Sequence, residues 1–575
     1  MINDILVNTS EEVFDAIVVG SGITGGWAAK ELTKNGLKTL MVERGPIVEH
    51  RKDYITEGKP PWEFDLRTKV TQKEKDEYYR VQQQCYAFHE GTKHFFVKDN
   101  ESPYQHPDKK PFSWIRGNQL GGKSLLWHRQ SYRWSQFDFE ANAKDGIGNP
   151  WPIGYGDLAK WYDYVERFVG ISGSAEGLAH LPDGIFQPPF ELNVPERDFS
   201  KKMSDMHPDA PVIVSRCAHL TNPQKEQVEL GRIKCMARNE CQKGCSFGAY
   251  FSTQSSTLPA ALKTGFLRIA PNSIVDSLIY DEQSKKVTGV RVIDRVSMKQ
   301  KEYKAKMVFM CASTLGTTQI LLNSKSRTFP SGIANSSGML GKNLMDHNYN
   351  AHIQADIEGY DNEFYKGRRP ASFYIPNIHF EKSKYHKSFK RGYAFAGGAS
   401  REDWQSLGAS HGLGTEFKEK IKNAGAWKIS MQAQGEMLPR ENNQVQLSQN
   451  HKDKWGIPQL DIDCEWSPNE LDMMEVAAQT GEKYFKDAGF SNVKAQPTYK
   501  PPGLAIHEVG TARMGADPKK SVLNAYNQAH DISNLFVTDG ASFCSSGVVN
   551  PSITFMALTA RAVDFAVSEF RQGRI

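Results

Sequence analysis

Three cysteines crowd into a short stretch of the chain and could together hold a metal centre. Cys235, Cys241 and Cys245 follow a Cys-x5-Cys-x3-Cys spacing, with glycine and polar residues between them that suit a loop. Thiolates are the usual ligands of iron–sulfur clusters. Zinc held by these cysteines and His219 is the alternative metal site, and three incidental thiols are the simplest interpretation. The spacing alone leaves all three open.

A histidine near the C-terminal end is the candidate for proton transfer. His507 begins a His-x-x-Gly-Thr segment, and Asn550 precedes a proline and an apolar helical pattern. Imidazole titrates near neutral pH, so it suits the removal of a hydroxyl proton. Taken in isolation, His507 is more often a packed, hydrogen-bonded side chain, and Asn550 is equally suited to capping a helix.

A glycine-rich turn near the N-terminal end predicts a dinucleotide site. The pattern comprises Gly20, Gly22 and Gly25, followed by Glu43. It lies between a β-branched run and a helical stretch, and a second apolar run ends at Glu43, which completes a βαβ unit. The turn and the helix N-terminus bind a pyrophosphate, and the acid accepts the ribose hydroxyls. FAD and NAD fit this spacing equally.

Elements of two kinds must position these residues. Runs at 274–280, 287–295 and 306–310 predict strands of the nucleotide sheet, the first two as a hairpin, and 554–570 predicts a helix. Between 348 and 500, alternating strands such as 351–355 and 428–432 predict an antiparallel sheet. We therefore expect an α/β fold with a Rossmann-like nucleotide-binding domain and a second, largely antiparallel substrate domain with helices.

The predicted domain boundaries make the nucleotide-binding domain discontinuous. It is assigned residues 1–50, 111–170, 212–347 and 501–575, and it carries the cysteine loop 235–245. The substrate or cap domain is assigned 348–500 with the excursions 51–110 and 171–211, because the composition turns polar and aromatic after residue 51.

Composition excludes several classes of protein. The chain has 575 residues, 39% hydrophobic residues and a formal net charge of +5 without a dense basic block, which favours a globular protein with a small-molecule partner over nucleic-acid binding. No apolar run approaches the roughly 18 residues of a membrane span, and the first residues lack a signal-peptide pattern. Eight cysteines are too few for a disulfide framework, so folding in a reducing compartment is expected.

Four segments carry a resemblance to a known family. The segments are 121–128 (Gly-Gly-Lys-Ser-Leu-Leu-Trp-His), 507–515 (His-Glu-Val-Gly-Thr-Ala-Arg-Met-Gly), 539–541 and 550–554. They resemble motifs of the glucose–methanol–choline (GMC) oxidoreductases and span both ends of the chain. One segment departs from the family, because 312–326 lacks the Ser-Gly-aliphatic-Gly run of its second signature.

The resemblance implies FAD as the cofactor. Its implied contacts are Gly20, Gly22, Gly25, Glu43, Gly121, Gly122, Ser124, Trp127, Asp539, Gly540, Asn550 and Thr554. Leu126 stands where covalently flavinylated relatives have a histidine, so the FAD is expected to be non-covalent. By the same resemblance His507 is the catalytic base, and Asn550 replaces a second histidine and orients the substrate hydroxyl.

Within the family the chain looks most like bacterial glucose and glycoside 3-dehydrogenases. Their catalytic subunits hold a three-iron, four-sulfur cluster through cysteines at the spacing of Cys235, Cys241 and Cys245. The resemblance implies electron transfer through the cluster to a cytochrome c or quinone-type acceptor. It also implies a small helper subunit, with periplasmic location by export on that partner; otherwise a cytoplasmic location is expected.

The sequence thus predicts an FAD-dependent dehydrogenase that oxidises a hydroxyl group of a sugar or glycoside. Trp127 and the strand from Gln432 towards Arg440 are candidates for contacts with a pyranose. The alternatives are an alcohol oxidase of the same family that uses oxygen, a lyase of the same fold that cleaves hydroxynitriles, and an electron-transfer subunit without a substrate of its own.

Overall fold

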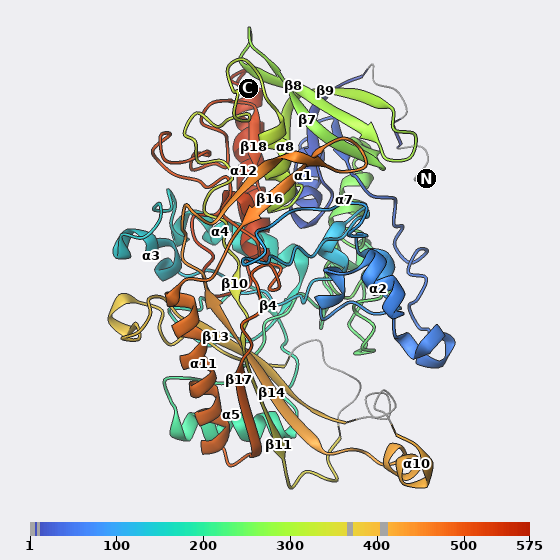
Figure 1. Cartoon of the computed structure of the whole chain (residues 1–575), viewed down its shortest axis with the longest axis vertical. Helices are drawn as coiled ribbons and strands as arrows, with labels where there is room; N and C mark the ends of the chain where they lie inside the picture. Colours follow the sequence, from blue (N-terminus) through green and yellow to red (C-terminus); the bar gives the residue numbers. More distant parts are fainter. Residues whose placement is uncertain (1–5, 8–11, 365–371, 403–411) are drawn as a thin grey trace.

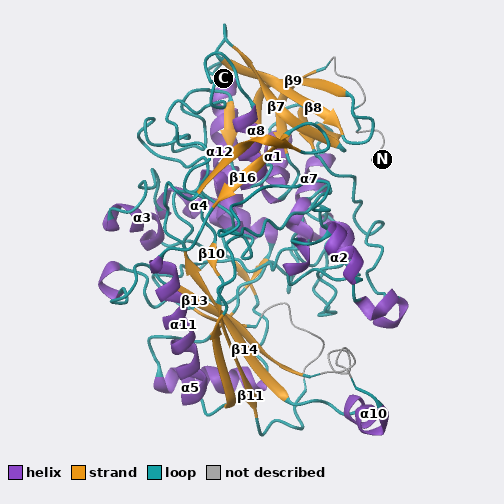
Figure 2. Cartoon of the chain, viewed as in Figure 1, coloured by secondary structure: helices purple, strands orange, loops and turns teal. Residues whose placement is uncertain are grey.

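The chain folds into two lobes, each built around its own β-sheet (Figure 1). The structure is a computed structural model that describes residues 6–7, 12–364, 372–402 and 412–575. Helices pack against both sheets, and long loops fill the region between the lobes (Figure 2). The protein therefore has the α/β architecture with a second, antiparallel sheet that its sequence predicts.

The first sheet has seven strands in the order β6–β2–β1–β9–β8–β7, and β18 pairs with the end of β9. Its strands are β1 (Val13–Val19), β2 (Thr39–Val42), β6 (Leu267–Ala270), β7 (Ser273–Asp281), β8 (Lys286–Asp294), β9 (Gln300–Met310) and β18 (Leu535–Val537). β1 runs parallel to β2 and β9, whereas β7, β8 and β9 form an antiparallel meander. The predicted βαβ unit and hairpin are both present.

Two helices from opposite ends of the sequence lie side by side on this sheet. They are α1 (Ile23–Lys34) and α12 (Ser552–Arg571). Leu32 of α1 and Val563 and Val567 of α12 pack with Val18 of β1 in one buried cluster. Burying each such side chain stabilises the fold by about 1.5–3 kcal/mol, which fixes the end of the chain next to its beginning.

The second sheet is antiparallel, in the order β17–β11–β14–β13–β12–β5, and β10 pairs with β14. Its strands are β5 (Ile213–Val214), β10 (His347–Asn348), β11 (Ala351–Ile357), β12 (Phe373–Ile375), β13 (Tyr393–Arg401), β14 (Trp427–Glu436) and β17 (Ser491–Pro497). Helices α5 (Val194–Met206) and α11 (Pro468–Asp487) cover one face, where Phe199 and Phe485 pack with Ile353 and Met431. On the opposite face, Tyr374 stacks on Tyr132, and Gln432 lines a cavity.

At β5 the predicted division into domains differs from the pairing of the strands. β5 lies within the range 212–347 that we assigned to the nucleotide-binding domain, yet it pairs with β12 at the edge of the antiparallel sheet. A strand of two residues shows no periodicity, so the pairing leaves no pattern in the sequence. The other boundaries stay predictions.

Further elements lie outside these two sheets and the helices named above. They are α2 (Gln72–Tyr78), α3 (Gln136–Asp145), α4 (Tyr155–Val169), α6 (Lys225–Glu229), α7 (Thr257–Lys263), α8 (Thr314–Asn323), α10 (Gly414–Lys422), β3 (Ile171–Ser172), β4 (Phe186–Gln187), β15 (Gln444–Lys452), β16 (Pro458–Asp463) and short 3-10 helices. Over the described ranges, no helix is both long and apolar enough to cross a bilayer.

Candidate active site

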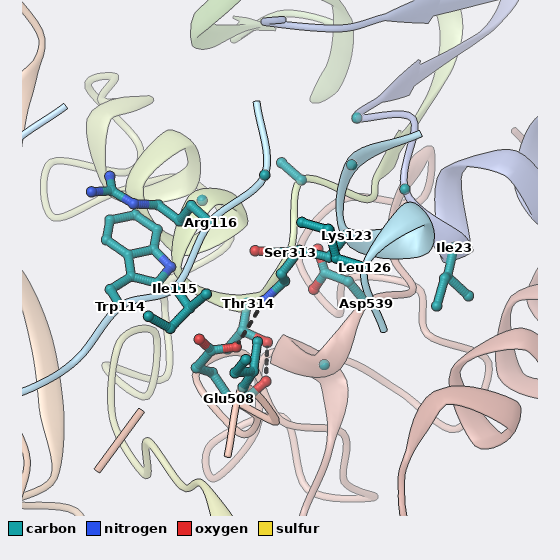
Figure 3. Close-up of a pocket in the computed structure, with 18 of the residues that line it drawn as sticks. Ile23, Trp114, Ile115, Arg116, Lys123, Leu126, Ser313, Thr314, Glu508 and Asp539 are labelled. Carbon is teal, nitrogen blue, oxygen red and sulfur yellow. Dashed lines mark hydrogen bonds and ion pairs between the residues drawn. The ribbon is translucent and has the colours of Figure 1, made fainter. Parts of the chain in front are cut away.

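A cavity of about 530 Å³ opens at the carboxyl ends of three parallel strands. Val19 ends β1, Glu43 follows β2 and Cys311 follows β9, and all three line the cavity. Gln432 of β14 lines it from the antiparallel sheet. Ligands of open α/β sheets bind at this edge, so the cavity is the candidate active site (Figure 3).

The glycine turn brings the backbone of α1 to this cavity. Gly20 has φ +94°, a conformation that favours glycine, and Gly22 is the N-cap of α1 without a side-chain cap. A Cβ on Gly22 would meet no protein atom within 4 Å, whereas a Cβ on Gly25 would overlap the carbonyl oxygen of Gly20. Gly22 thus borders the open space, and Gly25 allows the helix to pack on the turn. The uncapped N–H groups suit an anion.

Glu43 lies beside this turn and links it to the second glycine motif. Its carboxylate accepts hydrogen bonds from Ser21 N (3.2 Å), Ser21 Oγ (2.5 Å) and Gly45 N (2.8 Å). The backbone N–H of Gly121 donates to Ser21 Oγ at 2.7 Å. Burial raises the pKa of Glu43. The acid predicted for the ribose lines the cavity and is held in place by both loops.

The second glycine motif contributes one wall of the cavity. Gly122, Ser124, Leu126 and Trp127 line it, and the indole Nε1 of Trp127 donates to the carbonyl oxygen of Phe251 at 3.0 Å. Gly121 lies behind this wall with φ +87°, and a Cβ there would overlap the side chain of Gln254. Gly121 therefore supports the wall but does not line the cavity.

Residues near the C-terminal end of the chain also line the cavity. Asp539 and Gly540 line it, Thr317 Oγ1 donates to Asp539 Oδ2 at 2.5 Å, and burial raises the pKa of Asp539 to about 6. Thr554, expected at the cofactor, does not line the cavity. Its hydroxyl is buried 2.9 Å from the hydroxyl of Tyr162, because the first turn of α12 directs it there.

The predicted catalytic pair meets at the same cavity. His507 Nε2 lies 3.5 Å from Asn550 Nδ2, and both residues line the cavity. The N-cap of α12 is Pro551, so Asn550 precedes the cap and its amide is not needed there. Burial, followed by the neighbouring His347 and Lys123, holds the pKa of His507 well below its usual value. The imidazole is therefore neutral near pH 7.

Two neighbouring residues that the sequence analysis missed hold His507 in place. Asp346 accepts the backbone N–H groups of Gly503 (2.7 Å), Ala505 (3.2 Å) and His507 (3.1 Å). The ring of His347 lies against that of His507, with the two Nδ1 atoms 2.8 Å apart. No fixed spacing links residues 346 and 347 to residue 507, because they lie far apart in the sequence. The one available signal was that Asp346 and His347 are adjacent polar residues.

Several buried polar atoms at the cavity have no hydrogen-bond partner among the described residues. They are Trp114 Nε1, Arg116 Nε and Glu508 Oε1. All three residues line the cavity, and Figure 3 shows Trp114 and Arg116 together on one side of it. Unsatisfied buried polar groups cost about 1–3 kcal/mol each. Their presence is typical of a cavity whose polar ligand completes the hydrogen bonding.

The three predicted metal ligands surround a second, much smaller pocket. Cys235, Cys241 and Cys245 line it together with His219, whose Nε2 lies 3.7 Å from Cys241 Sγ and whose Nδ1 lies 3.0 Å from Cys217 Sγ. In the part of the chain that the structure describes, no three His, Cys, Asp or Glu side chains form a group that could hold a metal ion. Among the described residues, the side chains therefore form no ready metal site, either for zinc or for a cluster held by the three cysteines.

Comparisons with known proteins identify the family. The GMC oxidoreductase model for the N-terminal part matches residues 14–349, and the model for the C-terminal part matches 439–559. The chain belongs to the GMC oxidoreductase family, which binds FAD and acts on CH–OH groups. The resemblance carried by the glycine motifs and the C-terminal segments is confirmed.

Full-length relatives and a solved structure agree with this assignment. The chain is 26% identical to the fructose dehydrogenase large subunit of Gluconobacter japonicus, over 97% of this chain and 98% of that protein. It is 28% identical to 2-methyl-1,2-propanediol dehydrogenase of Mycolicibacterium austroafricanum, over 98% and 97%. Formate oxidase of Aspergillus oryzae shares the fold, with a TM-score of 0.60 and 15% identity over 98% of this chain and all of that one.

The residues at the cavity fit the family's cofactor. The open space at Gly22, the uncapped N-terminus of α1 and the carboxylate of Glu43 offer the donors and the acceptor that a dinucleotide requires. His507 and Asn550 line the same cavity, together with Tyr349 and Gln432 of the antiparallel lobe. The cavity thus combines residues suited to a dinucleotide with residues suited to proton transfer.

Proposed function

We propose that this protein is an FAD-dependent dehydrogenase that oxidises a hydroxyl group of a sugar or glycoside. The observation that carries the proposal is the neutral, buried imidazole of His507, paired with Asn550 in the cavity that the glycine turn also lines. When bound, FAD supplies the acceptor for the hydride. The residues that would hold it are Gly20, Gly22, Glu43, Gly122, Ser124, Trp127, Asp539 and Gly540.

In this proposal His507 removes the proton of the substrate hydroxyl. Loss of a hydride from an alcohol carbon leaves a protonated carbonyl unless the hydroxyl proton departs as well. A neutral imidazole can accept that proton at Nε2, and the amide of Asn550 can hold the hydroxyl oxygen next to it. An amide does not compete for the proton, so the two side chains divide the tasks of orientation and proton transfer.

Polar residues that line the cavity suit a polyhydroxylated substrate. Tyr349, Asn350 and Gln432 line it from the antiparallel lobe, together with Lys500. Of the strand that we expected to contact a pyranose, Gln432 alone among the described residues reaches the cavity. Gln434 donates to Val548 O at 2.6 Å, and Glu436 is buried in an ion pair with Arg391 at 2.8 Å.

We propose that electrons leave through a three-iron, four-sulfur cluster held by Cys235, Cys241 and Cys245. The support is that three thiols line one pocket, because a cluster of several irons takes its thiolates from separate points around it. Arg129 lines the FAD cavity and donates from Nη2 to the carbonyl oxygen of Cys241 at 2.6 Å. One side chain thus spans the distance between the two sites.

A cluster near the surface of the protein would be able to pass its electrons to another protein. Two of the exposed apolar side chains on this side, Met236 and Ile233, lie in or next to the cysteine loop. We propose a cytochrome c as acceptor and a small helper subunit as partner, in line with the relative from Gluconobacter japonicus, which is named a large subunit. Export on that helper would place the enzyme in the periplasm.

Anaerobic reduction of the bound flavin by a panel of sugars, glycosides and simple alcohols tests the proposed function. Bleaching of the flavin absorbance by sugars is expected, followed by reduction of cytochrome c. If only small aliphatic alcohols bleach it, the substrate class is wrong. If no hydroxyl compound does, the assignment as a dehydrogenase fails.

An oxidase is the second candidate, because the family includes formate oxidase of the same fold. The discriminating measurement is the rate at which reduced flavin reoxidises in air compared with its rate with cytochrome c. Faster reoxidation by oxygen, with hydrogen peroxide formed in equal amount to the product, would favour the oxidase.

A further inference from the structure

His347 occupies a buried position between the backbone and the proposed base. Its Nε2 lies 3.0 Å from the carbonyl oxygen of Gly547, and its Nδ1 lies 2.8 Å from Nδ1 of His507. The two rings meet edge to face, with centroids 4.9 Å apart. Both ring nitrogens of His347 therefore have defined partners.

The chemistry of these partners determines where the protons reside. A carbonyl oxygen only accepts hydrogen bonds, so Nε2 of His347 must carry a hydrogen and donate it to Gly547. In a neutral imidazole the other nitrogen then has a lone pair. Nδ1 of His347 accepts a hydrogen bond, and the hydrogen at 2.8 Å must come from Nδ1 of His507.

His507 is left with its lone pair on Nε2. That atom faces Asn550 Nδ2 at 3.5 Å, which is an amide N–H donor and so agrees with an acceptor at Nε2. His347 is neutral under ordinary conditions, because burial lowers its pKa to about 4. The chain of hydrogen bonds thus runs in one direction, from Asn550 to His507 to His347 to Gly547.

We propose that His347 is the positioning residue that fixes His507 in the tautomer with the proton on Nδ1 and the basic lone pair on Nε2. This inference rests on the proposed function only for its consequence, which is that Nε2 is the atom ready to accept the substrate proton. A carboxylate in this position would also orient the ring, but its charge would raise the pKa of His507 and retain the proton. A neutral acceptor orients the ring without that effect.

The backbone builds this arrangement from adjacent residues of one strand segment. Met345 and Val509 exchange two backbone hydrogen bonds of 2.9 Å, which aligns the segment before β10 with the segment that carries His507. Asp346 then holds the loop of His507 through its backbone, and His347 holds its ring. The ionisable groups that affect the charge of His507 besides His347 are Lys123, paired with Glu508, and His128.

Nitrogen NMR of the FAD-loaded protein labelled with ¹⁵N-histidine tests the tautomer directly. In the wild type at pH 7.5 the resonances of His507, assigned by their loss in His507→Gln, are expected to show a protonated Nδ1 and an unprotonated Nε2. A protonated Nε2 in the wild type would overturn the proposal. This readout does not depend on the substrate, so it stands apart from the test of the proposed function.

Two variants of His347 separate a positioning role from a structural one. His347→Leu removes the acceptor and is expected to give a mixture of His507 tautomers and to lower the rate of flavin reduction tenfold or more. His347→Asn keeps an acceptor near the position of Nδ1 and should restore most of the tautomer and the rate. A third variant, His347→Asp, should move the acid limb of the pH profile of flavin reduction to higher pH. Unchanged tautomers and rates in His347→Leu would refute the proposal, and if that variant does not fold, the wild-type spectrum still decides.

Discussion

Replacing Gly22 by alanine is expected to weaken FAD binding while leaving the fold intact. A Cβ at this position meets no protein atom within 4 Å, and the backbone φ of −65° is one that alanine adopts readily. Alanine is a poorer N-cap than glycine, but it also restricts the unfolded chain, which stabilises by about 0.4–1 kcal/mol. These effects oppose each other, so the free energy of unfolding of the FAD-free protein should change by less than about 1 kcal/mol.

Bound FAD would leave no room for the added methyl group if its pyrophosphate lies against the turn. A methyl group forced into a packed contact costs about 1–3 kcal/mol. Since 1.4 kcal/mol is a factor of ten, the Kd for FAD is expected to rise by about five-fold to 150-fold. FAD titration by quenching of flavin fluorescence, together with urea unfolding of the FAD-free protein, measures both quantities.

Gly25→Ala is the matched control, because it tests a contact within the protein. Its Cβ would overlap the carbonyl oxygen of Gly20, so this variant should lose stability even without FAD. Equal FAD affinity in Gly22→Ala and the wild type would show that the N-terminus of α1 does not cradle the cofactor. The expected result for Gly22→Ala is an unfolding midpoint in urea equal to that of the wild type, together with a higher Kd for FAD.

Four further outcomes follow from the site. His507→Ala should keep FAD but reduce the flavin about a hundredfold more slowly or worse, with the exposed His106→Ala unaffected; unchanged kinetics would remove His507 from the mechanism. Hot acid should release the flavin, since Leu126 cannot form a histidyl link, and flavin retained in the precipitate would contradict this. Cys241→Ser should lower the iron and sulfide content and the turnover with cytochrome c while sugar still bleaches the flavin, and iron-free wild-type protein made with ample iron would refute the cluster. Burial lowers the pKa of His347 to about 4, so the unfolded chain binds a proton there as pH falls from 6.5 to about 4. Other buried histidines, such as His50 and His180, have pKa values lowered to about 4 as well, so the difference in urea-unfolding stability between the wild type and His347→Asn isolates this contribution. That difference should fall by up to about 1.4 kcal/mol per pH unit over the window, and a pH-independent difference would argue against a neutral buried His347.

Local features of the site could be predicted from the sequence because their physics is local. The conformation of the turn from Gly20 to Gly25 depends on its own glycine residues. The spacing of apolar residues before and after the turn identifies β1 and α1. The same holds for α12, where Met556, Ala560, Val563 and Val567, spaced three or four residues apart, are all buried. Thr554 shows the limit, because Ser552 and Phe555 of the same helix line the cavity, whereas the hydroxyl of Thr554 contacts Tyr162.

Contacts between distant segments could not be predicted in this way. His347 meets His507 because a two-residue bridge between Met345 and Val509 aligns two loops, and neither loop has a period or a fixed spacing to the other. Arg129 likewise reaches Cys241 through a backbone carbonyl, a partner that any residue type at that position would offer. Such contacts depend on how the lobes pack, which is not encoded in any single segment.

The placement of these distant contacts separates the routes that the proposed reaction needs. Proton removal takes place at Nε2 of His507, and the hydrogen-bond chain that orients this base runs from His507 to His347 and Gly547. The electron route begins at the wall formed by residues 126–129, where Arg129 contacts the cysteine loop and the hydroxyl of Tyr250 donates to the carbonyl oxygen of Leu125 at 3.1 Å. Because no residue of one route hydrogen-bonds a residue of the other in these contacts, a variant such as Cys241→Ser can block electron exit while proton removal continues. The same separation explains why loss of His347 should slow flavin reduction without changing the iron content, and measuring both in one preparation tests whether the routes are independent.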